Sequence, residues 1–398
     1  MATEVTNPST NESEAIHCAL AGRCGGCPWI QIPVSEQRQK KISEVSLLEP
    51  QKPVQVVSVG EQRLRDRVDL TLIKNPGEPS QIGLWSLQTS GPNAPSGPRE
   101  LVDLKECPMM SEELETWFKE FREDLPPVAM GSVRLRISPT GERGVWLDLS
   151  HQDVKTLMDE KEYFTRLLQK AHVEIGQRKK PLRLKDGELK LEKKMDFKPW
   201  FWSWDENEKV YPLLGPIGGF TQSGRKANKA LVGEVLKSCR QSGDLLKLDH
   251  WVEAFCGSGN FTYPLSQSVE RVLAFENDRQ SLEALEEGLE KNQISNVKLM
   301  AVDAKSKRQM EEFHQELQKW SDYGLLADPP RSGLMKLLDE IKEQRIRPKA
   351  LVYVSCSAPS LLKDGEQLKK LGYKLQTLAL VDQFVHSPHV EWVSLWTL

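Results

Sequence analysis

The chain has 398 residues, of which 28% are charged, and its formal net charge is −3. That length suggests two or three domains, at roughly 100–200 residues each. No apolar run approaches the roughly 20 residues that a membrane-spanning helix needs, so we expect a cytoplasmic protein without a membrane partner. An acidic balance gives no general electrostatic case for nucleic-acid binding, so such a role must depend on a local surface.

The first half of the chain is predicted to be an α+β domain, residues 15–210, behind a disordered polar tail, residues 1–14. A helix is expected at 34–47. Short strands with turn residues between them follow from residue 54 to residue 149, and helices are expected at 111–122 and 152–170.

Four cysteines in this half predict a metal centre. Cys18, Cys24 and Cys27 have the spacing C-x5-C-x2-C, and Cys107 is the best fourth ligand. Thiolates are soft ligands for zinc or an iron–sulfur cluster, and either site needs four of them. The spacing does not decide between the two.

Two other features could contact RNA. Arg63, Arg65 and Arg67 recur at every second residue, so a strand would place them on one face, as a phosphate-binding strip or an exposed edge. The segment 176–198 is basic, although such runs are usually solvated surface. Three tryptophans between residues 200 and 204 are expected to pack into the core rather than stack bases.

The second half, residues 211–398, alternates predicted strands and helices. The strands are expected at 251–255, 271–275, 297–301, 324–327 and 350–354, with a final antiparallel hairpin at the sheet edge. This alternation predicts a Rossmann-like, doubly wound α/β domain with a mostly parallel sheet, in which ligands lie beyond the carboxyl ends of the strands.

The ends of all five strands carry residues of possible chemical function. Gly257 and Gly259 form a G-x-G loop without the third glycine or the lysine that phosphate loops use, so a cofactor without phosphates, S-adenosylmethionine, fits better. Glu276 and Asp303 end the next two strands, where they could bind the ribose hydroxyls and the adenine amino group. Cys356 ends a fifth strand as a candidate nucleophile, beside Asp328 on the fourth.

Several motifs resemble the RNA uracil-C5 methyltransferase family, which makes 5-methyluridine in bacterial rRNA and tRNA. They are V-S-C-S-A-P-S around Cys356, D-P-P-R at 328–331, F-x-Q at 220–222 and H-S-P-H-V-E at 386–391. The four cysteines resemble the rRNA-modifying branch of the family, which carries a [4Fe-4S] cluster. With no OB-like barrel before Cys18, the chain looks closest to the RlmC-type enzymes.

The resemblance implies a mechanism and a partner. Cys356 would add to C6 of a uracil, C5 would take the methyl group of S-adenosylmethionine, and Glu391 would remove the C5 proton. The helix after Cys356 is expected to lower the pKa of its thiol. The RNA would be 23S rRNA rather than tRNA, bound by a monomer with the base flipped out.

Further cofactor-pocket residues follow from the same resemblance. Gln222, Phe255 and Asn260 would line the pocket, and Asp328 would contact the base or the cofactor. The family has Asn where this chain has Gly224, which questions cofactor affinity. Two alternatives stay open: a cytosine-C5 methyltransferase, and a non-catalytic RNA-binding protein that keeps a vestigial methyltransferase fold.

Overall fold

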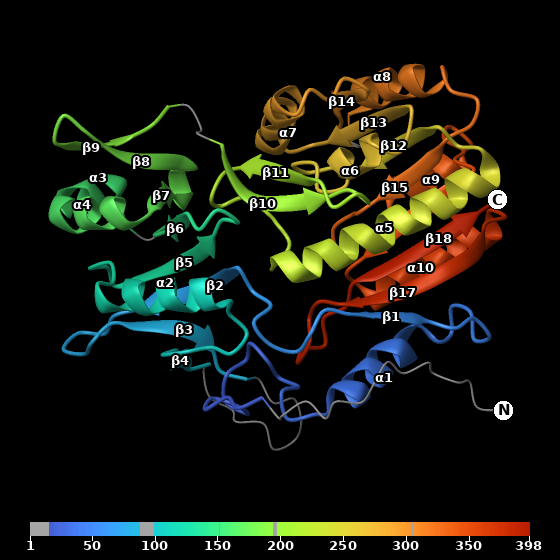
Figure 1. Cartoon of the computed structure of the whole chain (residues 1–398). Coiled ribbons are helices and arrows are strands. Elements are labelled where there is room, and N and C mark those ends of the chain that lie inside the picture. Colours follow the sequence, from blue (N-terminus) through green and yellow to red (C-terminus); the bar gives the residue numbers. More distant parts are fainter. Residues whose placement is uncertain (1–15, 88–98, 151, 194–196, 304–305) are drawn as a thin grey trace.

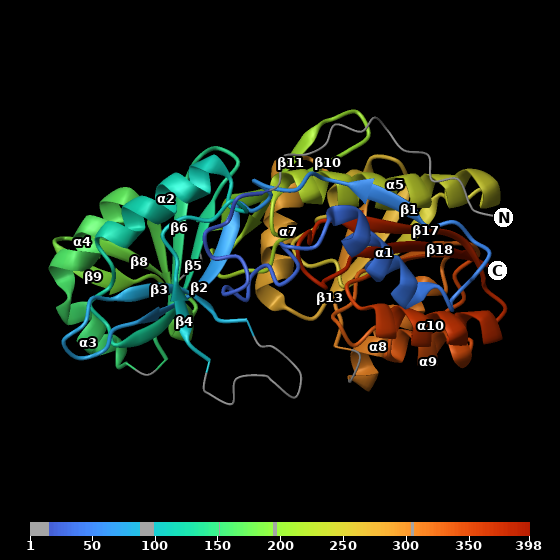
Figure 2. The same ribbon diagram turned by 90° about the horizontal axis from the view of Figure 1, so that it is seen from below.

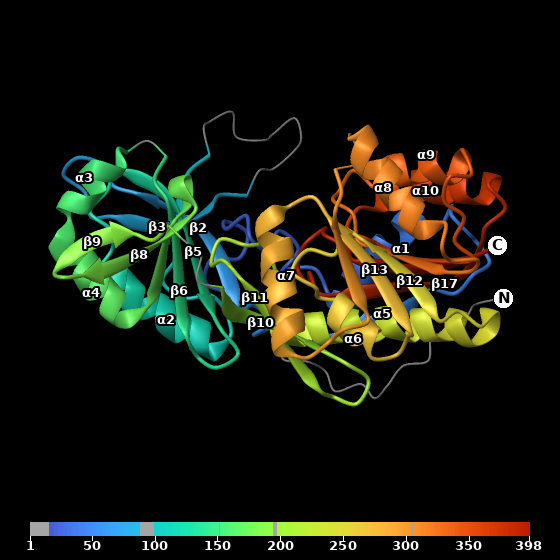
Figure 3. The same ribbon diagram turned by 90° about the horizontal axis from the view of Figure 1, so that it is seen from above.

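The computed structural model describes residues 16–87, 99–150, 152–193, 197–303 and 306–398. The predicted tail, residues 1–14, lies outside the described residues. The chain forms two bodies, each built on its own eight-stranded sheet, with a two-stranded hairpin between them (Figures 1 and 3). None of the described helices has the length and apolar character that crossing a membrane requires.

The first body is an antiparallel sheet with one parallel pair. Its strands lie in the order β4-β3-β2-β5-β6-β7-β8-β9, and only β6 and β7 run parallel. The strands are β2 (Arg67–Ile73), β3 (Gln81–Trp85), β4 (Leu101–Asp103), β5 (Met130–Ile137), β6 (Arg143–Asp148), β7 (His172–Ile175), β8 (Lys180–Lys185) and β9 (Glu188–Leu191). This confirms the predicted α+β architecture of the region.

Helices α2 (Glu112–Glu123), α3 (Val154–Asp159) and α4 (Lys161–Lys170) cover this sheet. Apolar side chains of α2 and α4, such as Trp117 and Phe164, are buried against alternate residues of the strands. The helix predicted at 152–170 is broken in two, because the backbone of Glu160 leaves the helical conformation.

The arginine strip expected from Arg63 to Arg67 does not exist as a strand face. β2 begins only at Arg67, and Arg63 has a left-handed backbone with φ of 57°. Arg63 instead forms an ion pair with Glu115, and Arg65 forms an isolated bridge with Met110. The three arginines do recur at every second residue, but a turn interrupts the strand before Arg67, so their side chains do not share one strand face.

The predicted basic segment, 176–198, forms the outer edge of the first sheet. It contains β8 and β9, which lie at the end of the first body farthest from the second (Figure 1). Two of its lysines pair with acids of the same hairpin, Lys185 with Glu192 and Lys190 with Glu188. This segment is therefore a solvated sheet edge rather than a surface beside the second body.

The second body is the expected mostly parallel α/β sheet. Its order is β1-β17-β18-β16-β15-β12-β13-β14. The strands are β12 (His250–Ala254), β13 (Arg271–Glu276), β14 (Val297–Ala301), β15 (Gly324–Ala327), β16 (Ala350–Ser355), β17 (Lys374–Asp382) and β18 (Trp392–Thr397). The helices are α5 (Arg225–Leu246), α6 (Thr262–Ser266), α7 (Arg279–Lys291), α8 (Lys307–Leu317), α9 (Lys336–Lys342) and α10 (Ala358–Lys370).

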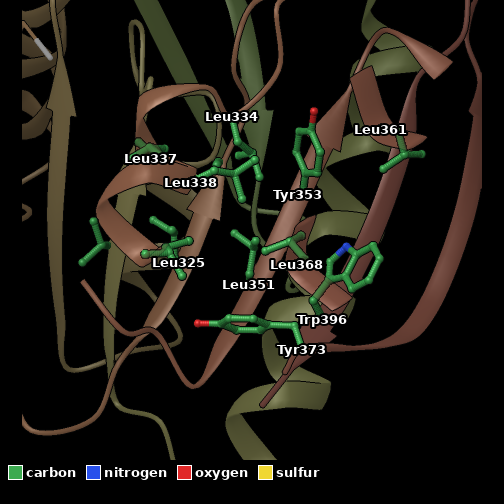
Figure 4. Close-up of a cluster of buried hydrophobic side chains, with 14 of the residues drawn as sticks. Leu325, Leu334, Leu337, Leu338, Leu351, Tyr353, Leu361, Leu368, Tyr373 and Trp396 are labelled. Carbon is green, nitrogen blue, oxygen red and sulfur yellow. The ribbon is translucent and has the colours of Figure 1, made fainter. Parts of the chain in front are cut away.

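Apolar side chains fill both faces of this sheet. On one face, Leu325, Leu351 and Trp396 from neighbouring strands meet Leu361 and Leu368 of α10 (Figure 4). On the other face, α5 and the hairpin β10 (Lys198–Trp204) and β11 (Val210–Gly215) pack against the same strands. Trp200 is buried as predicted, while Trp202 and Trp204 remain partly exposed.

Two N-terminal elements belong to the second body, contrary to a first domain that runs without interruption to residue 210. Strand β1 (Gln55–Ser58) pairs in parallel with β17, and helix α1 (Val34–Val45) packs on α10 (Figures 1 and 2). The C-terminal hairpin β17–β18 is therefore not the sheet edge, because β1 is. An open strand edge accepts any strand that reaches it, and sequence spacing cannot show which strand does.

Candidate active site

Strand register brings Cys356 and Glu391 together. β16 and β18 are antiparallel, and Ser355 lies opposite Trp392. Cys356 follows Ser355 and Glu391 precedes Trp392, so both residues leave the sheet at the same edge. β15 runs parallel to β16, and Asp328 directly follows its last residue, Ala327. The predicted nucleophile, base and acid thus meet at one end of the sheet, as the motifs imply.

The environment of Cys356 is the opposite of the predicted one. We expected the N-terminus of α10 to lower the pKa of the thiol, but the pKa is raised. Burial is the largest cause, and the carboxyl groups of Glu391 and Asp328 add to it, while Arg331 opposes them. Partial charges at a helix terminus are weaker than two nearby carboxylates. Burial and the two acidic neighbours therefore favour the neutral thiol of Cys356, and Arg331 favours the thiolate.

The two carboxyl groups beside Cys356 hold their protons unusually tightly. Burial raises the pKa of Asp328 to about 7. Burial and the nearby Asp328 raise the pKa of Glu391 well above its ordinary value, although Gln383 opposes this. Like charges in a dry pocket disfavour one another's ionisation. A carboxylate with a raised pKa is a stronger proton acceptor, which suits a general base.

Gln383 is a site residue that the sequence reasoning missed. Its side-chain nitrogen Nε2 donates to Glu391 Oε2 at 2.8 Å and to Gln222 Oε1 at 3.1 Å. All three side chains are buried. One amide group therefore links the carboxylate of Glu391 to the F-x-Q motif, about 160 residues earlier in the chain. The position of Gln383 just after β17 gave no local signal of this contact.

The loop that carries Gln222 is held by arginines of the first body. Arg136 Nη1 donates to the carbonyl of Ile217, and Arg67 Nη1 donates to the carbonyl of Thr221, both at 2.8 Å. Arg134 also donates to Gly218 O. Arg136 is buried, and its Nη1 and Nη2 both donate to this loop, while its Nε has no hydrogen-bond partner among the described residues. The first body thereby fixes the loop of the second body that carries Gln222.

Gly224 replaces the family Asn for a steric reason. A Cβ atom at this position would lie 1.7 Å from the carbonyl oxygen of Leu64, so no residue with a side chain fits without a backbone shift. The capping role of the missing Asn passes to Asp66, whose carboxylate accepts from Arg225 N at 2.7 Å and from Arg225 Nη2 at 2.9 Å. The helix α5 is thus capped from the first body. Packing against Leu64 therefore explains a glycine at this position.

The glycine loop turns sharply after β12. Phe255 adopts a left-handed backbone with φ of 62°, which is rare for a bulky residue and is found where a site constrains the chain. Gly257 N then donates to Glu276 Oε2 at 3.1 Å, which ties the loop to the end of β13. Asp303 lies one residue beyond Val302, which bonds to Glu276 O. These predicted cofactor residues converge at adjoining strand ends.

Asn260 of this loop and Glu253 of β12 lie in environments that the sequence did not predict. Asn260 exchanges two hydrogen bonds of 2.8 Å with the buried Asn228 of α5, so its amide is committed to the fold. Glu253, to which no role was assigned, is buried in β12, and neither carboxyl oxygen has a hydrogen-bond partner among the described residues. Burial, with Asp328 and Glu276 nearby, raises its pKa to about 8. This part of the pocket is strongly acidic.

The four predicted metal ligands come together. Cys18, Cys24, Cys27 and Cys107 line one cavity of about 200 Å³. Gly26 N donates to Cys24 Sγ at 3.4 Å, and the Cys24 segment bridges Ser86 beside β3. Burial and the neighbouring thiols raise the pKa of Cys27 to about 12. Within the described ranges, no three His, Cys, Asp or Glu side chains are arranged to hold a metal ion.

Comparison with known proteins identifies relatives by sequence and by structure. The family profile described as tRNA (Uracil-5-)-methyltransferase matches residues 206–397. An uncharacterised RNA methyltransferase of Bdellovibrio bacteriovorus is 35% identical over 390 residues, which cover 96% of this chain and 95% of that protein. The 23S rRNA (uracil(1939)-C(5))-methyltransferase RlmD of an Enterobacter species is 26% identical and covers 97% of this chain and 83% of its own length.

One further sequence relative is named as an enzyme of tRNA and tmRNA, and one solved structure shares the fold. A tRNA/tmRNA (uracil-C(5))-methyltransferase of a Nitratiruptor species is 26% identical over 94% of this chain and 98% of that protein. The crystal structure of Pyrococcus abyssi tRNA (uracil-54, C5)-methyltransferase, in complex with S-adenosyl-L-homocysteine, superimposes with a TM-score of 0.61. It covers 94% of this chain and 86% of its own at 19% identity, a likeness of fold.

Proposed function

The chain belongs to the RNA uracil-C5 methyltransferase family and is an S-adenosylmethionine-dependent enzyme, and we propose that it methylates C5 of a uridine in 23S rRNA through Cys356 and Glu391. The single observation that carries the residue assignment is the register of β16 and β18, which places the thiol and the buried carboxyl group at one strand end. No other cysteine of the second body is accessible, because Cys239 and Cys256 are both buried.

The proposed reaction starts at the thiolate of Cys356. The Cys356 thiolate adds to C6 of the uracil, and the electron pair moves to C5. C5 takes the methyl group, and the bond between that carbon and the sulfonium sulfur breaks. Glu391 then removes the proton from C5, the C6–S bond breaks, and Cys356 leaves as a thiolate. A pKa of Glu391 well above the ordinary value favours this proton abstraction.

Charge supports the cofactor assignment. Burial raises the pKa of Asp328 and is the largest cause of the raised pKa of Glu253, which repulsion from the nearby Asp328 and Glu276 raises further. A cationic ligand relieves this repulsion, whereas an anionic one adds to it. S-adenosylmethionine carries a permanent positive charge on sulfur that its product lacks. We infer that the acidic strand ends favour the cofactor over the spent product.

RNA binding is proposed at the junction of the two bodies. Phe220, two residues before Gln222, is 77% exposed, and Arg67 lies over its ring at 5.9 Å. An exposed aromatic ring beside a cation suits base stacking, which must replace the neighbours of a flipped uridine. Arg65 and Arg331 both act electrostatically on His389, so two cations border the pocket and could meet phosphates.

We also propose that Cys18, Cys24, Cys27 and Cys107 hold a [4Fe-4S] cluster. Four thiols around one cavity of about 200 Å³ supply the ligand set that such a cluster needs. The choice of an iron–sulfur cluster over zinc follows the resemblance of the cysteine spacing to the cluster-bearing branch of the family. The cluster would contribute structural stability or electron transfer.

The activity is tested with purified protein, methyl-labelled S-adenosylmethionine and unmodified transcripts of 23S rRNA and tRNA. Digestion and mass spectrometry should find 5-methyluridine in the rRNA. Cys356→Ala should abolish turnover, and Glu391→Gln should accumulate a covalent protein–RNA adduct on a denaturing gel. An active Cys356→Ala enzyme would remove the proposed nucleophile, and 5-methylcytidine as the product would favour the alternative activity.

The choice of RNA has a competing candidate. Curated relatives act on 23S rRNA or on tRNA and tmRNA at the same 26% identity. The cysteine set is the observation that favours rRNA, because it resembles the cluster-bearing branch. Methylation of the tRNA transcript alone would reverse that assignment. Cytoplasmic location and a monomeric state stay predictions, to be tested by fractionation and by light scattering.

A further inference from the structure

The loop between β17 and β18 ends at Glu391. Helix α1 contacts this loop through hydrogen bonds with residues 382–386. Most helices bury an apolar stripe. The buried residues of α1 are instead Gln37, Lys41 and Val45, and the two polar ones are almost inaccessible to solvent. Their hydrogen-bond partners identify what this polar face does.

Lys41 and Asp382 form an ion pair inside the protein. Lys41 Nζ donates to Asp382 Oδ1 at 2.8 Å and to the carbonyl of Phe384 at 3.0 Å. Arg38 Nε donates to the other carboxylate oxygen, Asp382 Oδ2, at 2.8 Å. The side chains of Lys41 and Asp382 are each 1% exposed. Asp382 is the last residue of β17, so this contact fixes the start of the loop.

Gln37 fixes the middle of the loop. Its Oε1 accepts from the backbone N of His386 at 2.7 Å, and its Nε2 lies 3.1 Å from His386 Nδ1. His386 has a left-handed backbone with φ of 67°, which L-residues rarely adopt without support. The carbonyl of His386 also accepts from Trp29 N at 2.9 Å. The strained residue is thus held at its backbone and its ring.

The same loop touches the cysteine cavity. Val385 packs with Leu64 and Met109 in a small buried cluster, and Cys27 and Cys107 lie against it. Trp29, which bonds to His386, is two residues after Cys27. The cysteine segment, helix α1 and the Glu391 loop therefore form one continuous set of contacts.

Buried ion pairs contribute little net stability compared with apolar side chains of the same volume. They do impose a definite geometry, because an unmatched partner would be left buried and unpaired. A helix that needed only to pack on the second body would have no use for Gln37 and Lys41. Their placement is explained if the exact path of the loop matters, and that path ends at Glu391.

We propose that Gln37 and Lys41 are positioning residues for Glu391, and that an intact cysteine site at the start of α1 keeps them in place. This proposal rests on the proposed role of Glu391 as the base. It assigns α1 to the last part of the reaction, proton removal from C5 and release of Cys356. Gln37 and Lys41 form no hydrogen bond with the residues predicted to bind the cofactor, within the part of the chain that the structure describes.

The test separates adduct formation from adduct release. The variant Gln37→Leu keeps the size of the side chain and removes its hydrogen bonds, and Gln39→Leu makes the same change at an exposed position of the same helix. With 23S rRNA transcript, Gln37→Leu should turn over at least tenfold more slowly and accumulate the covalent adduct, as Glu391→Gln does. Gln39→Leu should behave as the wild type.

A transcript containing 5-fluorouridine provides the discriminating control. Its C5 carries fluorine in place of the proton, so the adduct forms and methylates but cannot be released by Glu391. Gln37→Leu should form this adduct at the wild-type rate. If it forms the adduct as slowly as it turns over, Gln37 has a general structural role and the proposal fails. If the wild type forms no adduct at all, the covalent mechanism itself fails, which is a separate result.

A second pair of variants makes the test independent of one substitution. Lys41→Met removes the buried cation, and Lys40→Met removes a neighbouring exposed one. The same pattern is expected, so the proposal can be decided if either buried variant does not fold. Wild-type turnover in both Gln37→Leu and Lys41→Met would overturn it.

The cysteine link is tested without measuring activity. Hydrogen–deuterium exchange of residues 382–391 should increase severalfold in Cys27→Ser, as in Gln37→Leu, while residues 271–276 of β13 stay as protected as in the wild type. Unchanged exchange at 382–391 in Cys27→Ser would show that the cysteine site does not control the loop.

Discussion

The side-chain amide of Gln383 donates a hydrogen bond of 2.8 Å to the carboxylate of Glu391. The same nitrogen also donates to Gln222 at 3.1 Å. A donor facing a carboxylate favours its charged form, and this bond opposes the burial that raises the pKa of Glu391. Gln383 therefore sets both the orientation and the proton affinity of the proposed base.

Replacing Gln383 with Leu should shift the release of the covalent adduct to higher pH. A hydrogen bond to a charged group contributes about 1.5–3 kcal/mol, and about 1.4 kcal/mol corresponds to one pKa unit, so we expect a shift of about one unit. The direction follows because losing the donor raises the pKa of Glu391, which must be deprotonated to act. Single-turnover release rates across pH measure this, and Gln383→Glu offers a bulk-matched comparison. An unshifted profile would show that Gln383 does not tune the base.

Arg331 should affect the earlier step. It opposes the burial and the carboxylates that raise the pKa of Cys356. Arg331→Met should therefore raise this pKa further and move adduct formation to higher pH, by roughly half a unit because the exposed guanidinium is screened by water. Arg331→Lys keeps the charge and should retain most of the wild-type profile. Rates of adduct formation on 5-fluorouridine RNA at several pH values test this, and equal profiles for Met and wild type would contradict it.

Preference for S-adenosylmethionine over S-adenosylhomocysteine should increase with pH. Asp328 and Glu253 have pKa values of about 7 and about 8, so they lose their protons between about pH 6 and pH 9. Carboxylates attract the sulfonium charge, and their neutral forms do not, so cofactor affinity rises as pH rises through these values. The two ligands differ only at the sulfur. Calorimetry at both ends of this range should show the ratio of dissociation constants changing severalfold, and a constant ratio would contradict the charge argument.

Gly224 should not tolerate the residue that its family usually has there. Because a Cβ would lie 1.7 Å from Leu64 O, Gly224→Ala is expected to destabilise the protein by about 2 kcal/mol, and Gly224→Asn by at least as much. Gly233, in the exposed face of α5, has no atom within 4 Å of an added Cβ. Gly233→Ala should raise the free energy of unfolding by about 0.5–1 kcal/mol. Thermal and denaturant unfolding of Gly224→Ala and Gly233→Ala measure these changes in stability. A Gly224→Asn enzyme as stable as the wild type would show that the backbone of Leu64 moves aside.

The sequence predicted most of the second body because its signals are local. Apolar periodicity and turn residues placed β13 at 271–275 and β16 at 350–354, which the structure has at 271–276 and 350–355. In a parallel sheet all carboxyl ends face the same edge, so residues that end different strands must meet. Asp328 and Cys356 could therefore be placed in one pocket from the chain alone.

Only the tertiary structure decided what lies around these residues. The pKa of Cys356 is raised rather than lowered, mainly because the thiol is buried and further because Glu391 comes close to it from an antiparallel strand whose position the spacing does not give. Gln383 and Gly224 acquire their roles from partners far away in sequence, Gln222 and Leu64. Hydrogen bonds and charges act over a few ångströms in space, and sequence patterns report only neighbours along the chain. Cys356, Glu391 and Asp328 could be proposed from the sequence, whereas Gln383, the protonation of these groups and their support could not.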